Sequence, residues 1–153
     1  MDNLAATIAR YRASGLPFET AGPAPEAAIR QLEARCGYEL PPSYRAFLER
    51  IGSLSFHGRH IAGVVAGRID TGPSCAWYVT ELVRGQFELP PDVLVIEWGV
   101  YDPACLDFGR RRPDGEVPVA RFDPHTGVSL TTDPSFGVWL PVWVREAVIE
   151  AEG

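Results

Sequence analysis

A chain of 153 residues, 46% of them hydrophobic, is long enough to bury a core in one domain without disulfides or metals. No apolar run approaches the roughly 20 residues of a membrane span, and the first residues lack a signal-peptide pattern, so we expect a cytoplasmic protein. The net charge of −6 comes from residues 59–153, where 14 acids face 8 arginines, since residues 1–58 hold six of each. This acidity disfavours nucleic-acid binding and suits a basic protein partner, although a charge that only maintains solubility is the simpler alternative.

Cysteine and histidine usage gives no sign of a metal site. Cys36, Cys75 and Cys105 are widely spaced and form no Cys-x-x-Cys pair, which indicates buried thiols in a reducing compartment rather than a zinc site. His57 and His60 lie in a glycine-rich loop without a third ligand nearby, so we predict no metal and no other cofactor.

The N-terminal part of the chain predicts three helices. Residues 2–12 carry apolar side chains at helical spacing, and glycines and prolines follow them. A second helix begins near Pro25 and stops at Gly37. A third begins at Pro42 or Ser43, because the residue before a proline avoids helical angles and the Leu-Pro-Pro connection is therefore extended. These two helices form a hairpin whose apolar residues predict packing rather than catalysis.

After residue 58 the segments become short and rich in β-branched residues. Residues 60–67 and 93–98 predict strands, and residues 74–85 between them predict a helix with Ser74 as its N-cap and Gly85 as its stop.

Three further segments predict an antiparallel hairpin and one more strand. Residues 104–109 and 117–123 flank an Asp-Gly turn, which is a strong hairpin signal, and residues 124–132 predict a short strand after an exposed turn at His125. Four or five such strands in sequence indicate an antiparallel sheet or meander.

The C-terminal segment predicts an amphipathic helix. Asp133 is the expected cap and Pro134 the expected start, and Pro141 predicts a kink or two abutting segments. The whole chain, residues 1–153, is therefore predicted to be a single α+β domain. It has a central antiparallel sheet of about four to six strands, flanked by N-terminal helices and a C-terminal helix.

No catalytic motif is present. The chain lacks a phosphate loop, a Gly-x-Ser-x-Gly elbow and a His-Glu-x-x-His helix. Glu97 with Asp102, or Asp107 with Asp123, are candidate acid/base pairs, but acids at strand ends and turns also bond to local backbone. Arg110–Arg112 would suit an anion clamp or a solvated loop. We predict that the chain is not an enzyme.

Three stretches of the chain resemble a known protein family. The stretch AAIRQLEARCGYELPPSYRAFLERIG, residues 27–52, is similar to the helix, Gly, Leu-Pro, aromatic, Phe-Leu pattern of the SUKH superfamily of Smi/Knr-type domains. LPPDVLVIEWGVYDPACLDFG, residues 89–109, resembles its strand–turn–strand block, and VPVARFDPHTG with a later helix led by Phe136 gives a third match. The core motif region is 25–150. The IGSLS segment departs from the Asn-Gly-Gly turn common in the family, which leaves the subfamily open.

The resemblance implies a non-enzymatic protein-binding domain. Bacterial members are commonly immunity proteins that bind and neutralise a cognate toxin, often a nuclease with a basic surface; the alternative is a regulatory or scaffolding domain for a cellular partner. We expect a basic protein toxin as partner and neither nucleic acid nor membrane. Acids and aromatic residues at the strand ends and turns of the sheet are the predicted contact residues, with burial as the alternative for the tryptophan. These residues are Glu97, Trp98, Tyr101, Asp102, Asp107 and Asp114.

Overall fold

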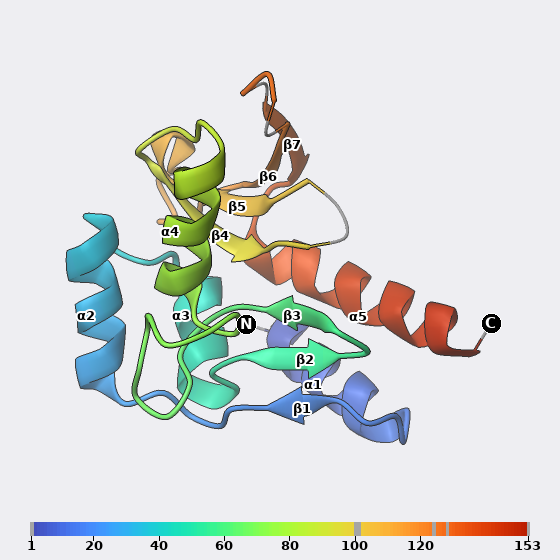
Figure 1. Ribbon diagram of the computed structural model, residues 1–153. Coiled ribbons are helices and arrows are strands. Elements are labelled where there is room, and N and C mark those ends of the chain that lie inside the picture. Colours follow the sequence, from blue (N-terminus) through green and yellow to red (C-terminus); the bar gives the residue numbers. More distant parts are fainter. Residues whose placement is uncertain (1, 100–101, 124, 128, 153) are drawn as a thin grey trace.

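The computed structural model describes residues 2–99, 102–123, 125–127 and 129–152 (Figure 1). The helices within these residues are α1 (Asp2–Ala13), α2 (Glu26–Cys36), α3 (Pro42–Arg50), α4 (Ala76–Gln86) and α5 (Phe136–Glu152), with a 3-10 turn η1 (Phe108–Arg110). One antiparallel sheet has the order β1 (Glu19–Thr20), β2 (Leu54–Phe56), β3 (Arg59–Ile61). The other has the order β4 (Val93–Glu97), β5 (Ala104–Asp107), β6 (Val119–Phe122), β7 (Ser129–Asp133). The predicted α+β class is confirmed.

The predicted helical hairpin is present, and its ends follow from glycine and proline. Gly37 ends α2 in the left-handed conformation at φ 84°, and its N–H donates to the Glu33 carbonyl. The Glu33 carboxylate then accepts from the Leu40 N–H at 2.8 Å, which ties the Leu-Pro-Pro connection back onto α2. Pro41 is extended at ψ 150°, and α3 begins at the next residue.

The apolar residues of this hairpin belong to the core. Tyr44 and Phe47 are fully buried and both meet Phe136 of α5, with ring centroids 5.1 Å apart in each pair. The Tyr44 hydroxyl donates to the Ala62 carbonyl at 2.7 Å, and burial raises its pKa. The prediction that the apolar residues of this stretch pack in the core is confirmed.

The strands form two sheets instead of one central sheet, which corrects the sequence-based picture (Figure 1). Of the predicted strand 60–67, only its first residues belong to β3; beyond it Ala62 donates to the Ile96 carbonyl at 2.8 Å and Gly63 to the Ser74 carbonyl at 2.9 Å. This segment therefore joins the two sheets. The short strands β1 and β2 were not predicted, because two or three residues carry no readable alternation.

A close backbone crossing holds the three-stranded sheet against α3. Val64 donates to the Gly52 carbonyl at 3.0 Å, and a Cβ on Gly63 would collide with that same carbonyl. Gly52 itself has φ 78° and faces the Gly22 carbonyl. Glycine is therefore required at both contacting positions.

Three predicted helix ends were wrong. Ser74 does not cap α4, because its hydroxyl lies 3.2 Å from Nδ1 of His60, and Gly85 lies inside the helix, which ends at Gln86. Asp133 ends β7 because the following proline keeps it extended; Ser135 caps α5 instead, accepting from the Val138 N–H at 3.2 Å. The helix then continues as one segment through Pro141.

The longest helix, α5, packs against α1, α3 and β7, and α4 packs against β4. Among the described residues, no helix combines the length and apolar character needed to cross a bilayer.

Candidate protein-binding surface

The predicted contact residues lie at two opposite ends of the four-stranded sheet. Val93 pairs with Asp107 and Glu97 with Ala104, so β4 ends where β5 begins. Glu97, Trp98 and Asp102 therefore lie at one end, while Asp107 and Asp114 lie at the other. Tyr101 falls outside the described residues. The six positions do not form one continuous surface, and their binding roles stay a prediction.

Glu97 is buried at the centre of a charged cluster. Its side chain is 8% exposed and accepts hydrogen bonds from Trp143 Nε1 at 2.7 Å, Arg59 Nη2 at 3.0 Å and Arg121 Nη2 at 3.1 Å. Arg59 also lies over the Trp143 ring, 5.0 Å from its centroid, and 3.5 Å from Glu150. The carboxylate thus joins β3, β4, β6 and α5 at this end of the sheet.

Asp107 and Asp114 stabilise turns at the opposite end. Asp107 Oδ1 accepts from the Gly109 N–H at 3.1 Å and so caps η1. Burial raises the pKa of Asp107, and the neighbouring charge of Asp92 acts in the same direction. Asp114 Oδ1 accepts from the Glu116 N–H at 2.9 Å. Both carboxylates are engaged with local backbone.

The end that holds Trp98 gathers aromatic side chains. Trp98 is half-buried, and its ring lies 5.7 Å from that of Phe87, which in turn lies 5.7 Å from the ring of His125. The three come from the α4–β4 connection, the end of β4 and the β6–β7 turn. The sequence marked His125 only as a turn residue and gave no signal for Phe87, because their proximity depends on how α4 crosses the sheet.

Two carboxylates belong to the same end of the sheet as these rings. Ala104 pairs with Arg121, and Phe122 donates to the Pro103 carbonyl at 3.2 Å, so Asp102 and Asp123, the next residue of each segment, lie at the same end of the sheet. Asp102 is exposed and Asp123 partly so. The N–H groups of His125 and Thr126 bond to Asp123 and lower its pKa, which keeps it ionised. Phe87, Trp98, Asp102, Asp123 and His125 are called the sheet-end surface below.

The charged cluster around Glu97 holds the β4–β5 connection of the sheet-end surface in place. Arg121 donates through Nη1 to the Asp102 carbonyl at 2.7 Å and through Nη2 to Glu97. A cavity between Arg59, His60 and Glu97, which Trp98 and Arg121 also line, has a volume of about 30 Å³. That volume holds a water molecule and is far below the roughly 300 Å³ at which ligand pockets begin.

The candidate acid/base pairs do not converge on a reaction centre. Asp107 and Asp123 lie at opposite ends of the sheet, and Glu97 is enclosed by its three donors while Asp102 is exposed. His60 Nδ1 lies 2.9 Å from the Ser55 hydroxyl. Among the described residues, no group of three or more His, Cys, Asp and Glu side chains could hold a metal ion.

Arg110, Arg111 and Arg112 donate hydrogen bonds to other segments of the chain. Arg110 donates to Thr131 Oγ1 at 3.1 Å, Arg111 donates to the carbonyls of Gly115 and Glu39, and Arg112 donates to the Pro134 carbonyl. These bonds join the β5–β6 turn to the α2–α3 connection and to the start of α5. Arg110 and Arg111 make these bonds while their side chains stay exposed.

Fold and surface together define a class: an α+β domain that presents a fixed aromatic and acidic surface at one end of a sheet. A family model described as SUKH_5, SMI1-KNR4 cell-wall, matches residues 1–144, and the chain belongs to that family. Its domains are generally non-enzymatic, and membership supports a protein-interaction or immunity-type role. No curated protein matches the chain at a significant level.

Proposed function

We propose that this protein is an immunity protein of the cytoplasm, which binds a cognate basic protein toxin through the sheet-end surface and neutralises it. The observation that carries the proposal is that Asp102, Asp123 and the half-exposed Trp98 lie at the same end of the four-stranded sheet. Tyr101 is proposed to join them, because it lies in the same connection.

The physical case rests on charge and rigidity. Surface carboxylates at one end of a sheet attract a basic partner and raise the association rate, and a tryptophan supplies the kind of apolar anchor that dominates protein interfaces. Arg121 and Glu97 hold the connection in place before binding, so little ordering is needed when the partner arrives. Asp107 and Asp114 are not part of this proposed contact area.

The test begins with the toxin gene that is expected beside the gene for this chain. Co-expression should protect cells from that toxin, and the two purified proteins should form a complex. In the double variant Asp102→Lys/Asp123→Lys, association should slow by roughly tenfold at low salt and become less salt-dependent. The matched control is Glu19→Lys/Glu39→Lys, which makes the same charge change at exposed positions away from the sheet end.

Equal association rates in the two double variants would exclude the sheet-end surface. Absence of both protection and complex formation would exclude the immunity role. If the chain instead binds a protein of its own cell through the same residues, the regulatory or scaffolding alternative replaces it.

A further inference from the structure

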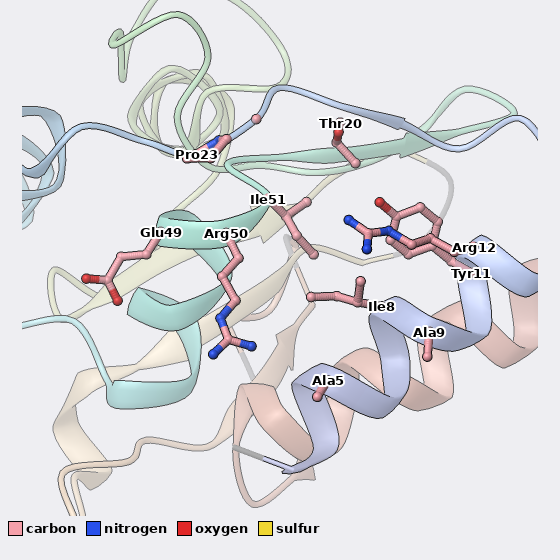
Figure 2. Close-up of a pocket in the computed structure, with 11 residues that line it drawn as sticks. Ala5, Ile8, Ala9, Tyr11, Arg12, Thr20, Pro23, Glu49, Arg50 and Ile51 are labelled. Carbon is pink, nitrogen blue, oxygen red and sulfur yellow. The ribbon is translucent and has the colours of Figure 1, made fainter.

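A groove on the other side of the molecule differs in charge from the sheet-end surface. It lies between α1, the end of α3 and the segment that follows β1, and it has a volume of about 730 Å³ (Figure 2). Pockets of roughly 300–1,000 Å³ are the size that binds ligands and peptide side chains. Nothing in the proposed function uses this groove.

The floor of the groove is apolar and shallow-walled. Ile8 and Ile51 face each other across it, and Pro23 borders it above in the view of Figure 2. Ala5 and Ala9 are exposed on α1 and carry only methyl groups, so a bound backbone is able to approach the helix closely. The row from Ala5 to Arg12 runs along the helix for about 10 Å, enough for three residues of an extended chain.

Two arginines border this floor without an acidic partner. Arg12 and Arg50 are exposed, and neither guanidinium has an ion-pair or hydrogen-bond partner among the described residues. Arg45, on the same helix as Arg50, is by contrast 3.0 Å from Glu26 and 3.1 Å from Glu33.

The carboxylate of Glu49, which also lines the groove, does not neutralise them. Glu49 lies 4.0 Å from Arg45, and Figure 2 shows it on the far side of Arg50 from Ile8. The groove therefore combines an apolar floor with uncompensated positive charge on its borders. Its complement is an apolar side chain flanked by acids.

We propose that this groove binds a peptide segment of a partner protein in which an apolar side chain lies between acidic residues. The apolar side chain contacts Ile8 and Ile51, and the acidic side chains pair with Arg12 and Arg50. The occupant is opposite in charge to the basic partner of the sheet-end surface, so the domain carries two sites that select different sequences.

The experiment uses a display library of random eight-residue peptides, selected on the full chain. We expect enrichment of sequences with an apolar residue flanked by Asp or Glu. A fluorescein-labelled peptide of the selected sequence should lose at least tenfold in affinity on Arg12→Gln/Arg50→Gln, measured by anisotropy. The control Arg10→Gln/Arg145→Gln removes the same charge from exposed residues outside the groove and should bind as the unaltered chain does.

A second variant tests position independently of charge. Ala9→Trp fills the groove from an exposed helical site and should abolish peptide binding while the circular dichroism spectrum is retained. Neutral or basic selected sequences, equal affinities in the two double variants, or undiminished binding by Ala9→Trp would each overturn the proposal. Protection against the toxin should persist in Arg12→Gln/Arg50→Gln, so failure at the groove and failure of the immunity role are separate results.

Discussion

Replacing Glu97 with alanine tests the charged cluster that supports the sheet-end surface. The change removes the acceptor of Trp143 Nε1 and of two guanidinium groups, while Arg59 and Arg121 stay only 11% and 25% exposed. Both arginines would then hold charge next to a cavity left by the missing side chain. The expected outcome is a large loss of stability rather than a local adjustment.

The size of the loss follows from which contacts remain. Removing one partner of a buried ion pair costs about 3–5 kcal/mol, and an orphaned buried N–H about 1–3 kcal/mol. These costs are not expected to add in full, because Arg59 keeps its ion pair with Glu150 at 3.5 Å. Arg121 keeps its hydrogen bond to the Asp102 carbonyl and is partly exposed to solvent. We expect a decrease of about 3 kcal/mol in the free energy of unfolding, which lowers Tm by roughly 6–12 °C in a domain of this size.

Urea denaturation followed by circular dichroism measures this quantity. The midpoint should fall while the m-value stays constant, because the surface exposed on unfolding hardly changes. Glu97→Gln, which keeps one acceptor oxygen, should lose about half as much, and Glu146→Ala, an exposed site on α5, should change stability by less than about 0.5 kcal/mol. A loss below about 1 kcal/mol for Glu97→Ala would refute the view that this cluster holds the two sheets and α5 together.

Three other measurements follow from the structure. Glu116→Gln should lower the free energy of unfolding by about 1–2 kcal/mol, measured by urea denaturation. The Glu116 carboxylate accepts hydrogen bonds from the Ser43 N–H at 3.2 Å and from the Ser43 hydroxyl at 2.8 Å at the start of α3. An unchanged free energy of unfolding would contradict this role. Carbon-detected NMR titration should place the pKa of Asp107 above 3.8 and that of Asp123 below it. The contribution of Asp107 to folding stability is then fully present below its unfolded pKa and is lost as the pH rises through the raised value. The contribution of Asp123 is present above 3.8 and is lost as the pH falls through the lowered value. The reverse order of the two pKa values would contradict these environments. An Ellman assay should show one accessible thiol, Cys36, with the two buried thiols reacting only on unfolding, and a Cys36→Ser chain that still reacts rapidly would contradict the packing.

Local signals were sufficient for most of the helices and for the four-stranded meander. Pro42 and Gly37 mark the ends of helices whose backbone angles those residue types prefer, and the Asp-Gly turn between β5 and β6 lies where it was predicted. The predicted caps at Ser74 and Asp133 failed because each residue had a competing partner. His60 takes the Ser74 hydroxyl, and strand pairing takes the backbone of Asp133.

The candidate site was only partly readable from the sequence. Trp98 and Asp102 were expected at a strand end and are found there, but Asp123 joins them only because of the β5–β6 register. Glu97 was expected at the surface. Its burial depends on Arg59 and Trp143, which lie 38 and 46 positions away along the chain.

Spacing of apolar, glycine and proline residues by itself determined the α+β class, the proline-led helical hairpin and the family, because those features depend on neighbours within a few residues. Only the tertiary structure decided that the strands divide into two sheets, which carboxylates are buried as supports, and that an arginine-bordered groove lies apart from the acidic sheet end. The reason is physical: a charge has a role only relative to the charges, rings and solvent around it, and those are set by segments that meet after the chain has folded.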